Sequence, residues 1–164
     1  MNGRTLRIEP LTAEAFAPFG QVIQTEGSNH FTINRGMTER YHDLATIQLG
    51  GTDPRPIISL FAGQPYALPL SLDMVERHPL GSQAFYPTSA ASWLVIVAEN
   101  EDEKPVRIRA FRPAPGQGVN IAINTWHGVL CPIEKPASFI VIDRGGLDRN
   151  LEEHFFDDPW LVDA

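Results

Sequence analysis

Short apolar segments separated by turn-forming residues set the strongest limit on how this chain can fold. Its 164 residues include 14 prolines and 13 glycines, which are spread along the sequence and divide it into short stretches. Such punctuation is typical of an all-β domain, in which short strands pack as a sandwich or a closed barrel. Eight segments fit the β pattern: 46–49, 57–61, 68–78, 83–86, 93–98, 106–111, 119–123 and 139–143.

The remaining segments predict a short helix near each end of the chain. Thr12 is suited to cap the first helix, which Pro18 ends. Residues 147–156 carry apolar side chains at helical spacing and predict a C-terminal helix that packs on the barrel or on a partner subunit. Residues 25–44 are polar and irregular, and we expect a loop that is mobile or covers a ligand. The sequence thus predicts one mainly β domain over residues 1–164.

The composition argues against several classes of function. The formal net charge of −7 disfavours nucleic acid as a partner. No apolar run approaches the ~20 residues that span a bilayer, and the first ten residues contain no apolar signal segment, so neither a membrane protein nor a secreted one is expected. Cys131 is the only cysteine, which suits a reducing compartment such as the cytoplasm. Its apolar neighbours favour a buried structural cysteine over a reactive thiol.

Arginine outnumbers lysine by eleven to two. The guanidinium group of arginine binds carboxylates through two parallel hydrogen bonds, so the excess of arginine over lysine favours an anionic substrate. Codon bias toward arginine is the alternative explanation.

The strand predicted over 68–78 carries two ionisable groups at the end of an apolar row. By alternation, one face of this strand holds Leu68, Leu70, Leu72 and Met74. The same alternation places Glu76 and His78 on this inward face and Arg77 on the opposite one. Ionisable groups on a core-facing row are costly unless they are paired, hydrogen-bonded or metal-bound. Gln83 opens the next strand and can return to the same mouth of the barrel. Alternatively, the strand end is frayed and both groups reach solvent.

A second motif lies in residues 115–128. A tight Pro-Gly turn precedes the strand at 119–123, and His127 follows it between Trp126 and Gly128. A lone histidine beside a tryptophan is usually structural. His78, however, is predicted to face inward from a distant strand. The pair of His78 and His127 therefore favours a functional site over a structural role for His127.

These two motifs resemble those of the cupin superfamily. The first cupin motif normally has two histidines one residue apart at a strand end, then an acidic residue on the next strand, and the second motif ends in another histidine. Here Glu76 stands where a histidine is common, and Gln83 where a glutamate is common. The sequence therefore departs from the usual metal-ligand set at two of four positions.

More narrowly, the stretch ERHPLGSQAFYP at 76–87 is similar to the signature of the ureidoglycolate lyase family. Further similarity lies in 34–36, 118–120, 126–128 and 139–144, so the resemblance covers nearly the whole chain. It implies a cupin-like antiparallel β-barrel, usually a homodimer. It also implies an enzyme, a carbon–nitrogen lyase that eliminates urea from ureidoglycolate to give glyoxylate in purine catabolism through allantoin.

That elimination needs a base for the carbinol proton, an acid for the leaving nitrogen and a group that holds the carboxylate. We expect Glu76, His78 and His127 to supply the acid and the base, with Gln83 beside them as a fourth catalytic candidate. Burial would raise the pKa of a glutamate and lower that of a histidine, which brings both toward neutrality.

Several arginines and asparagines are candidates for binding the substrate. Arg40 and Arg35 lie in the polar segment with Asn34, where a loop can close over a small acid. Arg144 is a third candidate for the carboxylate, although a strand-end ion pair with its neighbour would also explain it. Asn120 can bind the ureido group or merely satisfy a turn.

No organic cofactor is expected, and the need for a metal is left open. A divalent ion, Ni²⁺ by resemblance to the family, would be held by His78, Gln83 and His127. The alternatives to a urea-releasing lyase are an ammonia-releasing hydrolase of the same substrate, another metal-dependent cupin enzyme for a small acid, and a non-catalytic cupin that binds a small acid.

Overall fold

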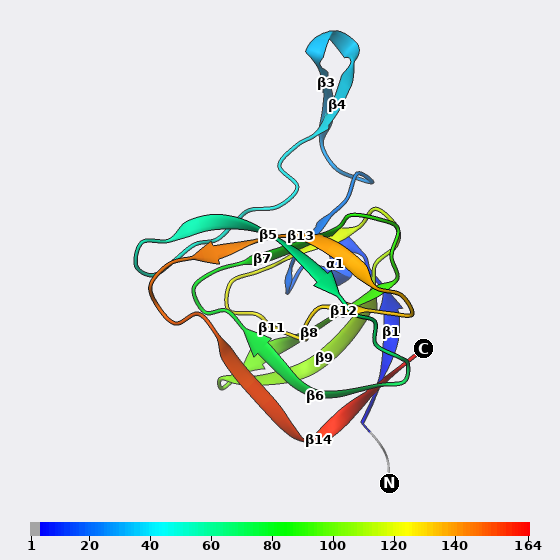
Figure 1. Ribbon diagram of the computed structural model, residues 1–164, viewed down its shortest axis with the longest axis vertical. Helices are drawn as coiled ribbons and strands as arrows, with labels where there is room; N and C mark the ends of the chain where they lie inside the picture. The colour runs from blue at the N-terminus through cyan, green and yellow to red at the C-terminus, as the bar shows by residue number, and fades with distance from the viewer. Residues whose placement is uncertain (1–3) are drawn as a thin grey trace.

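The structure is a computed structural model that describes residues 4–164, and its strands form a closed ring packed against a second sheet (Figure 1). Six strands close the ring in the order β11-β6-β14-β1-β9-β8, because β8 pairs back to β11, and β12 extends it beside β8. These strands are β1 (Thr5–Pro10), β6 (Leu70–Arg77), β8 (Trp93–Glu101), β9 (Lys104–Arg112), β11 (Trp126–His127), β12 (Cys131–Pro132) and β14 (Glu152–Asp163).

The second sheet has five strands in the order β2-β10-β7-β13-β5. They are β2 (Gly20–Ile23), β5 (Arg55–Gly63), β7 (Gln83–Pro87), β10 (Gly118–Ile121) and β13 (Ala137–Gly145). All ladders between the described strands are antiparallel except those of β1, which runs parallel to both β9 and β14. The expectation of a mainly β, cupin-like barrel is confirmed, and seven of the eight predicted β segments lie in these strands.

Two predicted elements are wrong. Residues 46–49 form only an isolated bridge from Leu49 to Gly81, because the polar groups of Gln48 bond to the turn that follows β6. Residues 147–156, predicted as a C-terminal helix, are instead a loop over 147–151 and the start of β14, which pairs with β6 on one side and β1 on the other. These two ladders provide hydrogen-bond partners for the backbone of β14 that a helix over 147–156 could not gain.

The N-terminal helix is a single turn, α1 (Ala13–Phe16). The hydroxyl of Thr12 accepts a hydrogen bond from the backbone N–H of Ala15 at 3.1 Å, as its capping signal predicted. No helix among residues 4–164 is long and apolar enough to cross a membrane.

Two apolar clusters hold the strands together, since alternate residues of β8 and β9 face opposite sides. One cluster lies between the ring and the five-stranded sheet and is centred on Phe16, Phe19, Phe85, Val95, Val97, Phe111, Val119, Ile121, Phe139 and Val141. The other fills the inside of the ring and is centred on Leu6, Leu72, Val75, Leu94, Ile96, Ala98, Ile108, Ala110, Trp126 and Val162. Cys131 is buried with this second cluster, and burial raises the pKa of its thiol to about 11. That environment agrees with a structural cysteine.

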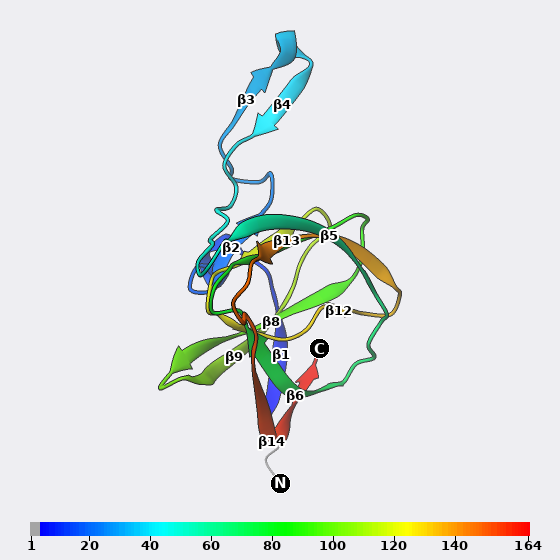
Figure 2. The same ribbon diagram turned by 60° about the vertical axis from the view of Figure 1, so that its left-hand side comes forward.

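A hairpin that we call the arm stands away from both sheets in two views (Figures 1 and 2). It consists of β3 (His30–Ile33), the 3-10 turn η1 (Asn34–Gly36) and β4 (Thr38–Tyr41), which pair only with each other as a two-stranded sheet. The predicted irregular loop over 25–44 is therefore mostly an ordered hairpin. At its tip, Asn34 and Arg35 both have positive φ angles.

Candidate active site

Strand pairing places His127 opposite Glu76. β11 lies between β6 and β8, so that His127 pairs with Glu76 on one side and with Val97 on the other. Val97 belongs to the apolar cluster between the two sheets, and paired residues of a ladder share a face. The side chains of His127 and Glu76 therefore point to the end of the layer between the sheets.

His78 completes a cluster of three ionisable side chains. Its Nε2 lies 3.8 Å from Oε1 of Glu76, and its ring centroid lies 5.1 Å from that of His127. One nitrogen or oxygen from each of the three residues lies within 4.8 Å of the others. The structure thus brings together Glu76, His78 and His127, as their positions in two motifs predicted.

The Nδ1 atoms of the two histidines are held by backbone carbonyls, which leaves their Nε2 atoms facing the site. Nδ1 of His127 donates to the carbonyl of Gly128 at 2.9 Å, and Nδ1 of His78 donates to the carbonyl of Asn150 at 2.8 Å. A carbonyl only accepts, so in a neutral ring the Nε2 atom carries the lone pair. Both Nε2 atoms are buried and have no hydrogen-bond partner among residues 4–164. The site therefore contains two buried imidazole nitrogens whose hydrogen-bonding capacity the described residues do not use.

Burial shifts the ionisation of this cluster toward the neutral forms. His127 is only 2% exposed, and burial, aided by the charge of His78, lowers its pKa to about 4. Burial also raises the pKa of Glu76, an effect that His78 opposes and Glu153 reinforces. A neutral imidazole and a carboxyl group that retains its proton more readily than usual consequently lie side by side.

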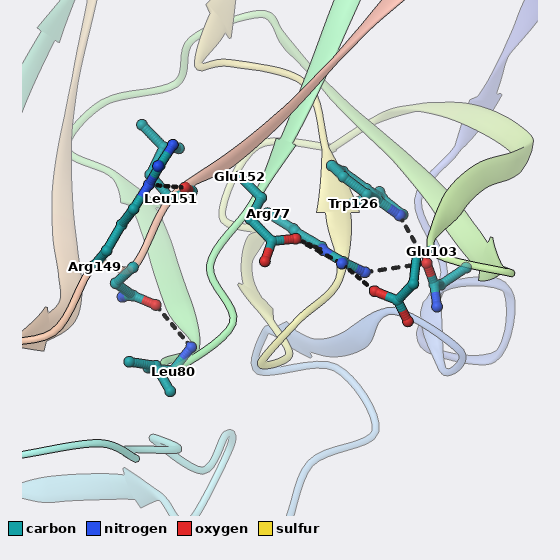
Figure 3. Close-up of polar contacts among 9 residues, drawn as sticks. Arg77, Leu80, Glu103, Trp126, Arg149, Leu151 and Glu152 are labelled. Atoms are coloured by element: carbon teal, nitrogen blue, oxygen red, sulfur yellow. Dashed lines mark hydrogen bonds and ion pairs between the residues drawn. The ribbon is translucent and has the colours of Figure 1, made fainter.

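Arg77 anchors the strand that carries Glu76 and His78, and Figure 3 shows its contacts. Its guanidinium donates to Glu152 at 2.7 Å, to Asn100 at 3.1 Å and to Glu103. It also lies 4.4 Å from the centre of the Trp126 ring, whose Nε1 donates to the same Asn100 oxygen at 3.0 Å. The sequence predicted that Arg77 faces away from His78, and it does, but it is buried rather than exposed to solvent.

Asn150 fixes the turn after β6, a role that no sequence signal indicated. Its backbone carbonyl holds Nδ1 of His78, and its side-chain oxygen accepts from the backbone N–H of Leu80 at 2.7 Å. The neighbouring Arg149 donates to the carbonyl of Leu151 at 3.2 Å (Figure 3). One asparagine therefore sets both the path of the turn and the orientation of the imidazole.

Gln83 lies at the start of β7 and is buried, with an exposed fraction of 6%. Its side-chain N–H donates to Asp143 at 3.1 Å. Asp143 is a residue that the sequence interpretation assigned only to an ion pair with Arg144. The structure pairs Arg144 with Asp148 instead, at 3.7 Å.

The remaining predicted binding residues do not gather at the histidines within one chain. Arg144 is buried and donates to the backbone carbonyls of Gly50 and Thr52 at 2.6 and 3.4 Å, which positions the loop they belong to. Asn120 pairs with Ala84 across the sheet and faces outward.

The amide of Asn120 donates to Gln21 at 2.8 Å and to the carbonyl of Thr46 at 2.9 Å. It therefore joins the outer face of the sheet to the segment that follows the arm. Asn34, Arg35 and Arg40 all lie on the arm.

Comparisons with known proteins cover almost the entire chain. The profile of a family described as ureidoglycolate lyase matches residues 3–163. A protein named ureidoglycolate lyase from Chelativorans sp. (strain BNC1) is 55% identical over 159 residues, which are 97% of this chain and 96% of that protein. Ureidoglycolate lyase 2 of Rhizobium meliloti (strain 1021) is 52% identical over 158 residues, or 96% and 97% of the two chains. Ureidoglycolate lyase of Mesorhizobium japonicum is 55% identical over 153 residues, or 93% and 94%.

Proposed function

The chain belongs to the ureidoglycolate lyase family, and from this premise we infer that it eliminates urea from ureidoglycolate at Glu76, His78 and His127. In this reaction the carbinol O–H loses its proton, the C=O bond of glyoxylate forms, the bond from the same carbon to the ureido nitrogen breaks, and that nitrogen gains a proton. The chain must therefore supply one proton acceptor and one proton donor. The observation that carries the proposal is the convergence of one carboxyl group and two bare imidazole nitrogens within 4.8 Å.

His127 is the proposed base. Its lowered pKa keeps the ring neutral at pH 7, and its Nδ1–H is held by the Gly128 carbonyl, so the lone pair of Nε2 faces the site. A neutral histidine with a fixed tautomer is ready to accept the carbinol proton. Its burial also keeps bulk water away from the reacting carbon.

Glu76 is the proposed acid. Burial raises its pKa, which increases the fraction of the carboxyl group that carries a proton near neutral pH. His78 lies within 3.8 Å of this carboxyl group and can pass protons to and from it between turnovers. Because Asn150 fixes the His78 ring, the three groups stay in one arrangement while the substrate reacts.

The same three residues also fit a divalent metal ion. Both histidines offer a bare Nε2 while their Nδ1–H groups bond to backbone carbonyls, which is how metal-bound histidines are usually oriented. Two imidazoles and a carboxylate suit Ni²⁺ or a similar ion, and we propose Glu76, His78 and His127 as its ligands. Gln83, the further ligand that the sequence suggested, is hydrogen-bonded to Asp143. When bound, such an ion would polarise a substrate oxygen as a Lewis acid.

The substrate carboxylate needs a cation, and we propose that the arm of a second copy supplies it. Arg35 lies at the tip of the arm, and Arg40 stacks on the ring of Phe31 at 5.8 Å. The arm projects from its own barrel (Figures 1 and 2), and both arginines are exposed, so they can reach another molecule. A two-stranded hairpin is marginally stable alone in water, which favours an arm that packs on a partner.

Exposed apolar side chains support this homodimer. On the arm, Phe31 and Met37 are 45% and 85% exposed, and on the outer face of the five-stranded sheet Ile58 and Leu60 are 77% and 75% exposed. The segment after the arm lies against that same face, where Thr46 accepts from Asn120. The arm and the sheet face are therefore continuous, and in a two-fold dimer each arm can pack on the sheet of its partner.

Subunit complementation tests whether the arm acts in the partner's site. The variants His127→Ala and Arg35→Ala/Arg40→Ala should each be inactive. After mixing and re-association, a heterodimer combines the intact His127 of one chain with the intact arm of the other, which should restore about a quarter of the wild-type activity. A mixture that stays inactive despite forming heterodimers, or a protein that is monomeric in sedimentation, would contradict the proposed dimer.

We further propose that the enzyme works in the cytoplasm, in the breakdown of purines through allantoin. The lone, buried Cys131 suits a reducing compartment.

Product analysis tests the function itself. The purified protein is incubated with each enantiomer of ureidoglycolate, and urea, ammonia and glyoxylate are quantified separately before and after chelation, together with bound metal per chain. We expect equal amounts of urea and glyoxylate. Ammonia in place of urea would identify a hydrolase, and absence of turnover with both enantiomers would refute the lyase. Loss of a stoichiometric metal together with activity would assign the histidines as ligands rather than as the base.

A further inference from the structure

Most of the unsatisfied buried polar atoms lie at one end of the layer between the sheets. Among residues 4–164, six buried side-chain nitrogen or oxygen atoms have no hydrogen-bond partner. They are His78 Nε2, Gln83 Oε1, Asn120 Oδ1, His127 Nε2, Asp143 Oδ1 and Trp160 Nε1. Two belong to the histidines of the site. Two more belong to the hydrogen-bonded pair of Gln83 and Asp143, which the proposed acid–base chemistry does not use.

The pair lies at the level of the histidines. The rings of Trp93 on β8 and Phe139 on β13 touch across the layer, with centroids 4.9 Å apart. A more direct link runs along the chain, because His78 follows the end of β6 and Gln83 begins β7 after a short turn. Gln83 and its hydrogen-bonded neighbour Asp143 therefore lie at the end of the layer where His78 lies.

The pair also faces the layer. Phe85 of β7 and Val141 of β13 are paired across the sheet and belong to the apolar cluster between the sheets. Gln83 and Asp143 each lie two residues away from them on the same strands, and side chains two residues apart share a face. The apolar layer therefore ends in polar groups on both sides, with the histidines on the ring and the Gln83–Asp143 pair on the opposite sheet.

The free atoms of this pair are both acceptors. The side-chain N–H of Gln83 donates to Oδ2 of Asp143, which leaves Oε1 of Gln83 and Oδ1 of Asp143 without a donor. A buried acceptor without a partner is destabilising, so two such atoms side by side favour a ligand that brings N–H groups. The carboxylate of a small acid is excluded from this position because Asp143 repels it.

Building on the proposed function, we propose that Gln83 and Asp143 bind the ureido end of the substrate. The two free oxygens accept hydrogen bonds from the N–H groups of the ureido moiety, including its terminal NH₂. The pair consequently directs the substrate carboxylate away from Asp143 and sets the ureido nitrogen within reach of the acid on β6. Asp143 is thus a specificity-determining residue that separates ureidoglycolate from small acids without an amide.

The variant Asp143→Asn tests this role. It keeps the size of the side chain but removes the charge and part of the acceptor capacity. Loss of a hydrogen bond to a charged acceptor should raise KM for ureidoglycolate about 10-fold to 100-fold, with a smaller change in kcat. Glyoxylate has no ureido group and is repelled by the charge of Asp143, so its dissociation constant, measured by calorimetry, should not rise in the variant. Asp73→Asn, which changes an exposed aspartate on β6, is the matched control and should alter neither quantity.

Two results would overturn the proposal while leaving the lyase assignment intact. One is an unchanged KM in Asp143→Asn, and the other is weaker binding of glyoxylate in step with the substrate, which would indicate general damage to the site. If the variant fails to fold, the unaltered protein is assayed with ureidoglycolate dimethylated on its terminal nitrogen. We expect kcat/KM to fall at least 10-fold for this analogue, which lacks the NH₂ donors. Normal turnover of the analogue would contradict the inference. A wild-type protein that turns over neither compound would instead refute the lyase itself.

Discussion

The buried imidazole of His127 should make folding stability depend on pH in a defined window. Its pKa is about 4 in the folded protein, against 6.5 for an unhindered histidine. Above pH 6.5 the residue is neutral in both the folded and the unfolded chain, so its full contribution to stability is retained. As the pH falls below 6.5, the unfolded chain binds a proton that the folded chain does not, and the free energy of unfolding declines until the pH passes the folded pKa.

The size of this effect follows from the two pKa values. Between pH 7.5 and pH 5.5, linkage through His127 alone should lower the free energy of unfolding by between about 1 and 2 kcal/mol. Carboxylates elsewhere add their own pH dependence, so the measured quantity is the difference between the wild type and His127→Gln, which cannot titrate. Urea denaturation followed by tryptophan fluorescence at both pH values, on chelator-treated protein, provides the four free energies.

A control and a refuting result complete this test. His42→Gln removes an exposed histidine and should keep the wild-type dependence on pH. If the free energies of the wild type and His127→Gln decline in parallel between the two pH values, His127 is not held neutral by burial. The proposed base would then lose its physical basis.

Three further substitutions probe other parts of the structure. Arg77→Met should lower the free energy of unfolding by about 2 kcal/mol in urea titrations, because it removes a buried cation stacked on an indole and its hydrogen bonds. Arg107→Met changes an exposed arginine that also pairs with two glutamates, and it should shift the urea midpoint much less. Glu76→Gln should lower kcat at least ~100-fold and remove the decline in kcat that the wild type shows as the pH rises through the raised pKa of Glu76. Phe139→Ala should destabilise the fold by about 3–5 kcal/mol, since it leaves a cavity beside a fully buried aromatic contact, and a shift in the urea midpoint measures the loss.

The sequence predicted the parts of this molecule that depend on local pattern. Alternation along residues 68–78 indicated that Glu76 and His78 lie together, and the turn before His127 indicated where the second histidine enters. Both predictions concern residues whose neighbours in space are set by strand period. The same reasoning predicted seven segments that lie in strands of the two sheets, because turn residues mark their ends. The common face predicted for Glu76, His78 and Leu72 was wrong. The β6–β14 ladder shifts register between Leu72 and Met74, so that Val75 joins Leu72 inside the ring.

The errors arise where distant segments decide the outcome. The apolar spacing near residue 151 suits a helix, but β14 gains two ladders from β1 and β6, which lie far away in sequence. Asn150 reaches His78 across 72 positions, and Asp143 reaches Gln83 across 60, so neither contact leaves a local signal. The arm shows the converse case, in which a polar stretch forms an ordered hairpin although little of it is buried within the chain.

Turnover of ureidoglycolate by His127→Ala tests the central claim most directly, with urea and glyoxylate measured as products. The account predicts that kcat falls at least ~100-fold while the urea midpoint at pH 7.5 shows a folded protein and glyoxylate still binds. Near-normal turnover by this folded variant would contradict the assignment of Glu76, His78 and His127 as the site of the reaction.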